Sequence, residues 1–157
     1  PAVWNQNAAS FNAKGNTTVS GMQYKSEEGL TLAFQNGWDK EAYTNGKMWQ
    51  VATLRPGKYR LEVTYAYTMV VSDAGNFISA LMAKGNSESD IPNVADIEQL
   101  NGVCAIYDKA GTNDDSGVLV TPSFEVTETT DVVIGFLTSL AKGNSYFKVT
   151  ELKLILE

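Results

Sequence analysis

Residues 58–71 read KYRLEVTYAYTMVV, and the alternation within this stretch decides the fold class. Its odd-numbered positions are all apolar or aromatic, while charged, hydroxylated or small side chains occupy the even positions from 58 to 68. A period of two is typical of a strand with one buried face. We therefore expect a long strand whose inward side chains are Tyr59, Leu61, Val63, Tyr65, Tyr67, Met69 and Val71.

The segments on either side of this stretch extend the β pattern. Arg55-Pro56-Gly57 predicts a tight turn, since proline presets φ and glycine tolerates a positive φ. We expect residues 48–54 before that turn to form the hairpin partner of the long strand. Residues 77–83 and 132–137 are continuous apolar runs, which predict strands covered on both faces. A further strand is marked by Leu30, Leu32 and Phe34.

Two irregularities are also predicted. Pro122 lies within the strand-like segment 118–126, which favours an edge position or a bulge. In the last strand the apolar positions change from odd to even numbers, which requires one extra residue near Thr150-Glu151. Residues 91–100 are expected to hold one short helical turn. Strands separated by regular turn signals indicate an all-β fold, an antiparallel β-sandwich of the jelly-roll kind.

Composition restricts the possible functions. The chain has 157 residues, enough for a single domain, and no apolar run approaches the roughly 20 residues needed to span a bilayer. Twelve basic and eighteen acidic residues give a net charge of −6, which disfavours nucleic acid as a partner. Histidine is absent, which excludes His-dependent nucleophiles and imidazole metal sites. The single Cys104 can form neither an internal disulfide nor a thiolate zinc site.

The order of the strands predicts where the loops lie. If each strand reverses direction, loops fall alternately at the two ends of the sandwich. With the turn at 55–57 at one end, the loop before Lys47, the loop after Val71, and segments 108–117 and 139–145 all fall at the other end.

Those loops contain aromatic, amide and carboxylate side chains, which suit sugar recognition. The C–H face of a pyranose stacks on an aromatic ring, and its hydroxyls take paired donors and acceptors. We expect the rings of Trp38 and Tyr43 to stack on the sugar. The polar residues expected to hydrogen-bond its hydroxyls are Asp73, Asn76, Asp114 and Asn144. Tyr107 and Lys142 are expected to flank the sugar.

Other interpretations of the same residues remain open. Trp38 could plug the end of the sandwich, which would favour a structural spacer or protein-interaction domain without a sugar site. Asp73, Asp108, Asp114 and Asp115 could hold calcium, but their spacing does not match an EF-hand, and a solvated acidic loop is the favoured interpretation. We expect no cofactor and no catalysis, because the carboxylates lie in loops and nothing in the sequence indicates a deep cleft.

Several motifs resemble a known pattern. Lys47-Met-Trp-Gln50 followed by Leu54-Arg-Pro-Gly-Lys-Tyr-Arg-Leu61 resembles a motif of C-terminal β-sandwich domains in Bacteroidetes surface lipoproteins. Here Arg55-Pro56 replaces Pro-Ala, and Trp49 stands where tyrosine is usual. The segments 83–87, 90–94 and 143–149 also fit, so the resemblance covers roughly residues 28–157.

Such domains are similar to galactose-binding-like (discoidin-type) jelly rolls. The resemblance implies an accessory role in glycan foraging, with a polysaccharide as partner and a location at the cell surface or in the periplasm. We therefore expect residues 1–157 to form one sandwich domain excised from a longer secreted or surface protein, with no membrane insertion of its own. Its expected function is non-catalytic carbohydrate binding, and the alternative is a spacer.

Overall fold

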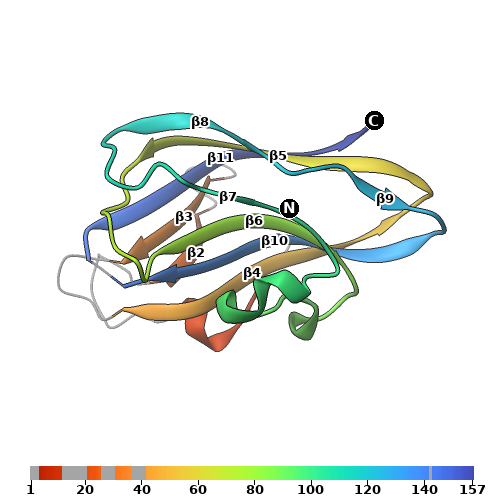
Figure 1. Cartoon of the computed structure of the whole chain (residues 1–157), viewed down its shortest axis with the longest axis horizontal. Helices are drawn as coiled ribbons and strands as arrows, with labels where there is room; N and C mark the ends of the chain where they lie inside the picture. The colour runs from red at the N-terminus through yellow and green to blue at the C-terminus, as the bar shows by residue number, and fades with distance from the viewer. Residues whose placement is uncertain (1–3, 12–20, 26–30, 37–41, 142) are drawn as a thin grey trace.

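Two antiparallel β-sheets face each other in the computed structural model of the chain (Figure 1). The structure describes residues 4–11, 21–25, 31–36, 42–141 and 143–157. Within these ranges sheet A contains, in spatial order, β1 (Asn5–Gln6), β4 (Tyr43–Leu54), β10 (Thr130–Leu140), β6 (Phe77–Lys84) and β7 (Gly102–Ile106). Sheet B contains β2 (Gly21–Lys25), β3 (Thr31–Asn36), β11 (Ser145–Leu156), β5 (Gly57–Thr68) and β8 (Asp115–Val120), and β9 (Phe124–Val126) also pairs with β5. Short 3-10 helices are η1 (Ala8–Phe11), η3 (Glu88–Asp90) and η4 (Val94–Gln99). The protein is an all-β antiparallel sandwich, as the alternation predicts.

The core lies between the two sheets, and β5 supplies much of it. Tyr59, Leu61, Val63 and Tyr65 are at most 7% exposed. They pack with buried residues of β4, β6, β10 and β11 in one apolar cluster. The inward parity of this part of β5 is confirmed.

The parity of β5 changes after Tyr65, where the sequence-based prediction is wrong. The pairing with β8 shifts register between Tyr65 and Thr68, and Tyr67 is 69% exposed. Thr68 and Val70 are buried instead. One extra residue in a strand moves every following side chain to the opposite face. Tyr67, Met69 and Val71 therefore lose the inward positions expected for them.

The predicted hairpin between residues 48–54 and β5 is also wrong. β4 pairs with β1 and β10, whereas β5 pairs with β11, β8 and β9. Arg55-Pro56 therefore carries the chain from one sheet to the other. Alternation specifies which face of a strand is buried, but it does not specify the neighbouring strand.

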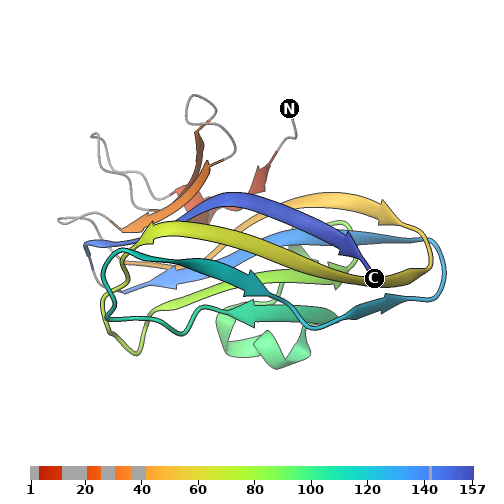
Figure 2. The ribbon, with the colours of Figure 1, turned by 90° about the horizontal axis from the view of Figure 1, so that it is seen from above.

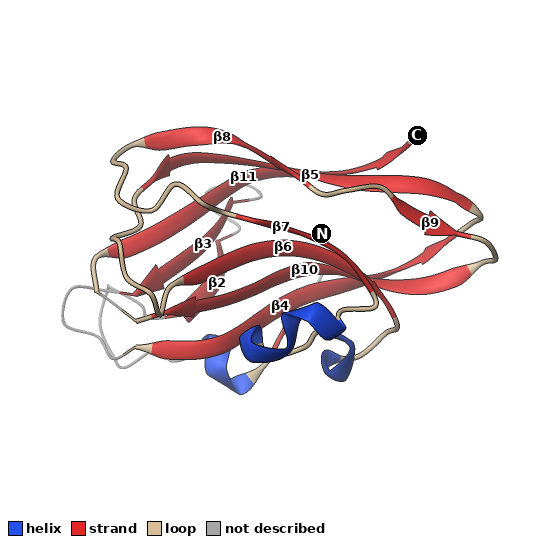
Figure 3. Ribbon diagram, viewed as in Figure 1, coloured by secondary structure: helices blue, strands red, loops and turns tan. Residues whose placement is uncertain are grey.

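Strands β6 and β10 are covered on both faces, as their apolar runs predict. Their inner faces join the core, and their outer faces pack under the segment that carries η3 and η4 (Figure 3). Ile91, which lies between the two 3-10 helices, is fully buried against this outer face. The predicted short helical segment is confirmed, and it acts as a partial cover for sheet A.

The two predicted irregularities are confirmed. Pro122 lies between β8 and β9, which both pair with β5 at the edge of sheet B. Strand β11 shifts register between Val149 and Glu151, so that both Val149 and Leu152 face the core cluster.

Loops gather at one end of the sandwich, as the strand order predicts. Figure 1 shows at the left the connections β5–β6, β7–β8 and β10–β11, beside the end of β3 and the start of β4. The C-terminus lies toward the opposite end (Figure 2), where the Glu157 N–H donates to the Lys58 carbonyl oxygen at 2.8 Å. In the described part of the chain, no helix is both long and apolar enough to cross a membrane.

Candidate functional site

Hydrogen bonds join the loops at this end into one surface. The Gly111 N–H donates to the Val70 carbonyl oxygen at 2.6 Å, which links the β7–β8 and β5–β6 connections. The Asn144 N–H donates to the Asn36 carbonyl oxygen at 2.8 Å, which links the β10–β11 connection to the end of β3. The structure therefore brings these segments together as the topology predicts.

Asn76 and Asp73, which are expected to bond a ligand, form hydrogen bonds that hold the loops. The Asn76 amide donates to the Val71 carbonyl oxygen and accepts from the Ala141 N–H, both at 2.8 Å. The Asp73 carboxylate accepts the Gly75 N–H at 2.8 Å within its own turn. Asn76 thus links the β5–β6 connection to the β10–β11 connection, and Asp73 stabilises a turn within the β5–β6 connection.

Asp114 and Asn144 are exposed on the same surface. Their φ angles are 52° and 64°, in the left-handed region that Asn and Asp tolerate better than most residues. Both therefore fit the turns they occupy, and both keep their side chains at the surface.

Tyr43 and Tyr107 lie in the core rather than on a ligand-facing surface. Tyr43 is 4% exposed, and its hydroxyl lies 2.9 Å from the Thr138 hydroxyl. Tyr107 is 7% exposed and donates to Asp115 at 2.8 Å, while its ring packs edge-on against Tyr65. Neither ring has a face left for a sugar, because apolar neighbours fill the interior. The other two predicted residues, Trp38 and Lys142, lie outside the described residues.

These buried phenols make the fold sensitive to alkali. Burial raises the pKa of Tyr43, and burial with the nearby Asp115 raises the pKa values of Tyr65 and Tyr107. Above pH 10.0, the ordinary tyrosine pKa, the unfolded chain loses phenolic protons that the folded chain retains, so stability falls as pH rises. Burial lowers the pKa of Lys47. This shift makes the stability rise with pH, but the rise ends near 10.5, the ordinary lysine pKa.

We therefore expect the free energy of unfolding to fall between pH 10.5 and about 12, by about 1.4 kcal/mol per pH unit for each phenol that stays protonated only in the folded state. The Tyr43→Phe variant should lose about that much of the slope in urea titrations across this range. An unchanged slope would contradict the assignment of Tyr43 as a buried, titrating phenol.

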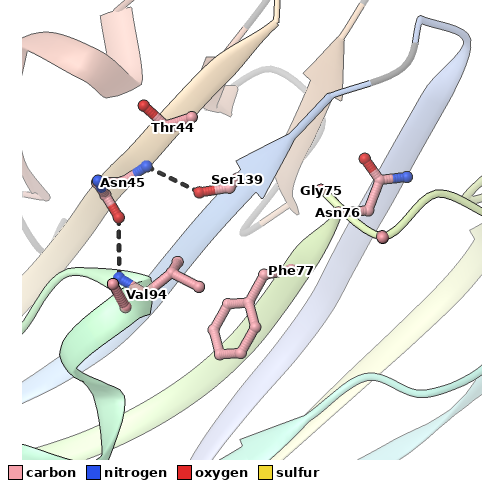
Figure 4. Close-up of a pocket in the computed structure, with 9 residues that line it drawn as sticks. Thr44, Asn45, Gly75, Asn76, Phe77, Val94 and Ser139 are labelled. Atoms are coloured by element: carbon pink, nitrogen blue, oxygen red, sulfur yellow. Dashed lines mark hydrogen bonds between the residues drawn. The ribbon is translucent and has the colours of Figure 1, made fainter.

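A groove of about 370 Å³ opens on the outer face of sheet A at the loop end (Figure 4). Residues from the starts of β4 and β6, the end of β10, the β5–β6 connection and the start of η4 line it. They are Thr44, Asn45, Ala74, Gly75, Asn76, Phe77, Val94, Ala95 and Ser139.

An irregularity in β4 shapes this groove. The pairing of β4 with β10 shifts register between Thr138 and Leu140, and Asn45 has a φ of 56°. The Asn45 N–H donates to Ser139 Oγ, and Asn45 Oδ1 accepts the Val94 N–H, both at 2.9 Å (Figure 4). Asn45 therefore ties the start of η4, one wall of the groove, to the sheet.

A buried lysine stabilises the segment just before η4, on the same side of the groove. Lys47 is 7% exposed, and its ammonium group donates to the Ile91 carbonyl oxygen at 2.5 Å. Ile91 begins the short connection between η3 and η4, and Val94 ends it. The Lys47 bond and the Asn45 contact therefore fix both ends of this connection to β4.

The lining combines neutral polar groups with one aromatic ring. Thr44 is exposed, Ser139 contributes a hydroxyl, and Asn45 contributes an amide. Phe77 is half-buried and presents its ring to the groove (Figure 4). None of the nine lining side chains is ionisable. The groove can therefore offer hydrogen-bond donors, acceptors and an apolar surface to an uncharged ligand.

Of the six residues proposed from sequence that the structure describes, only Asn76 lines the groove. Thr44, Asn45, Phe77 and Ser139 belong to strand ends, and their alternation gave no signal that they face a hollow rather than solvent. The hollow forms because η4 covers only part of sheet A, which depends on contacts between segments far apart in sequence.

The acidic loop residues do not assemble a metal site in the part of the chain that is described. No group of three or more acidic or cysteine side chains there is close enough to hold an ion. The calcium alternative therefore gains no support from Asp73, Asp108, Asp114 and Asp115.

Comparison with protein families gives a match over most of the chain. A family model described as "Domain of unknown function (DUF5013)" matches residues 1–135. No curated protein matches the chain.

Proposed function

The chain belongs to the DUF5013 family, and we propose that it is a non-catalytic carbohydrate-binding domain that recognises a glycan at the loop end of the sandwich. The groove on sheet A supports this proposal best. Its volume of about 370 Å³ falls within the ~300–1,000 Å³ typical of small-molecule sites.

The side chains of the groove suit a sugar ring. A pyranose would place its C–H face on Phe77, since aliphatic C–H groups pack well on aromatic surfaces. Its hydroxyls would exchange hydrogen bonds with the exposed Thr44 hydroxyl. They would accept hydrogen bonds from the Ser139 hydroxyl and from Asn45 Nδ2, because Ser139 Oγ and Asn45 Oδ1 already accept backbone N–H groups.

The charge of the site favours a neutral glycan and argues against catalysis. Among the described residues that line the groove, none carries a side chain that could serve as a general acid or base. The net charge of −6 disfavours nucleic acid and other polyanions. We propose that the domain needs no cofactor for binding, and that glycans without acidic groups are its preferred partners.

The family resemblance supports a more specific setting. Lys47–Gln50 and Leu54–Leu61, which carry the resemblance, lie on β4, on β5 and in the crossing between the sheets. We propose that the sandwich is of the galactose-binding-like type. We further propose that it serves an extracytoplasmic, glycan-foraging surface lipoprotein of the Bacteroidetes kind.

The test begins with a glycan array that includes neutral and acidic saccharides. We expect the protein to bind a neutral glycan, and the Ala74→Trp variant to bind that glycan at least tenfold more weakly. Ala74 is exposed and lines the groove, so the new indole would occupy the ligand's space without removing any core contact.

The matched control is Thr129→Trp, which adds the same ring at an exposed turn between β9 and β10. Calorimetric titration should give this variant the same affinity for the glycan as the unmodified protein. Failure of the protein to bind any glycan on the array would contradict the proposal and favour the spacer alternative.

A further inference from the structure

Tyr67 has an unusual backbone conformation. Its φ is 54°, in the left-handed region that a bulky side chain rarely adopts. The side chain is nevertheless 69% exposed, so burial of the ring does not compensate for the strained backbone. Residues held in such conformations cluster at functional sites.

A bulge in β5 produces this exposure. Tyr65 pairs with Gly117 and Thr68 pairs with Asp115, so β5 has one residue more than β8 between these pairs. The Tyr67 N–H donates to Ser116 Oγ at 3.3 Å. Bulges commonly redirect a side chain at functional sites. Glycine would satisfy the same φ without strain, so the turn itself does not require tyrosine.

The residues around Tyr67 form a small patch on the outer face of sheet B. On β11, Tyr146 pairs with Met69, and the Lys148 N–H donates to Thr68 Oγ1 at 3.3 Å. The Lys148 ammonium group lies 5.5 Å from the centre of the half-buried Tyr146 ring. We call Tyr67, Ser116, Tyr146 and Lys148 the tyrosine patch.

The Tyr67 ring has no aromatic partner among the described residues, in contrast to Tyr65, which packs with Tyr107 and Phe147. The Tyr67 ring is exposed, and the two strands beside it carry a hydroxyl, on Ser116, and an ammonium group, on Lys148, on the same face of sheet B. This combination matches a saccharide, since a sugar ring has an apolar C–H face edged by hydroxyls.

We propose that the tyrosine patch is a second saccharide subsite, on the sheet opposite the groove, in which Tyr67 is the stacking platform. Ser116 and Lys148 donate hydrogen bonds to the hydroxyls of the stacked ring. The proposal rests on the proposed function, because it assumes that the domain binds glycans. It adds a second contact for the same polysaccharide, and two linked contacts raise the affinity for a long chain.

The test compares Tyr67→Gly with Tyr67→Phe. Glycine removes the ring and the strain together, so we expect affinity for the polysaccharide to fall at least tenfold while the urea midpoint is unchanged or higher. Phenylalanine keeps the stacking face, and its affinity should stay within threefold of that of the unmodified protein. A residue whose loss weakens binding but not folding contacts the ligand.

Amide chemical shifts locate the two subsites separately. Titration with the glycan found on the array should shift Ser116, Tyr146 and Lys148 in the unmodified protein and in Ala74→Trp, but not in Tyr67→Gly. Groove residues should still shift in Tyr67→Gly. If the groove residues shift while the patch is silent in every protein, the second subsite is overturned and the proposed function stands. If no saccharide shifts either surface, both are overturned. A lower urea midpoint for Tyr67→Gly would assign the ring a structural role and overturn the platform.

Discussion

Replacement of Phe136 by alanine is expected to lower the free energy of unfolding by about 3–5 kcal/mol. Phe136 is fully buried on β10, the strand that pairs with both β4 and β6. Its ring centre lies 4.9 Å from that of Phe34 in the opposite sheet and 6.0 Å from that of Trp4. The variant loses the transfer free energy of a whole ring, and the cavity that remains cannot collapse between two hydrogen-bonded sheets.

Urea titration followed by tryptophan fluorescence measures this loss. The control is Val118→Ala on β8, where the side chain is 51% exposed and the change should stay within about 0.5 kcal/mol. A loss below 1 kcal/mol for Phe136→Ala would show that the two sheets do not pack through this residue.

The Gly135→Ala substitution is expected to cost about 3 kcal/mol, the upper part of the usual range for overpacking. A Cβ atom at Gly135 would lie 2.0 Å from the Met48 carbonyl oxygen and 2.7 Å from Trp49 Cα. Both obstacles are backbone atoms of β4, so the change of a side-chain rotamer cannot relieve the overlap. The pairing between β10 and β4 at the centre of sheet A must open instead.

A matched glycine separates this effect from that of alanine itself. At Gly57 the closest atom to a new Cβ is Leu156 Cδ1 at 2.8 Å, the end of a side chain that is 63% exposed and free to move. Gly57→Ala should therefore change the stability by less than 1 kcal/mol. Equal losses for both variants in thermal unfolding would contradict the close approach of β10 to β4.

The fold follows from the sequence wherever a local pattern carries the information. The alternation at Tyr59–Tyr65 predicts a strand with one buried face, and the apolar runs of β6 and β10 predict strands covered on both sides. The odd-to-even change after Val149 predicts the bulge in β11, because the apolar residues themselves change parity there.

No such signal in the sequence predicts the bulge in β5. Tyr67, Met69 and Val71 continue the apolar alternation past the register shift that follows Tyr65, where the inward face changes to even-numbered residues. Aromatic residues are equally suited to a core and to an exposed platform, so their identity does not distinguish the two. Only the register of β5 against β8 and β11 decides which face each of them occupies.

For the candidate site, too, some features can be predicted from the sequence and others cannot. The sequence predicts that several loops meet at one end, since strand reversal alone requires it, and Asn76 is placed there correctly. It does not distinguish a ring that packs inward, such as Tyr43, from one that lines a surface, such as Phe77.

The sequence by itself therefore determined most of the strands, the buried face of β5 up to Tyr65 and the end at which the loops gather, but it did not predict β1 or β2. These properties depend on neighbours in the chain, with a period of two. The tertiary structure alone decided that β4 and β5 belong to different sheets, that Tyr67 faces solvent and that η4 leaves a groove beside Asn45. These properties depend on pairing and packing between distant segments, whose free energies no local pattern encodes.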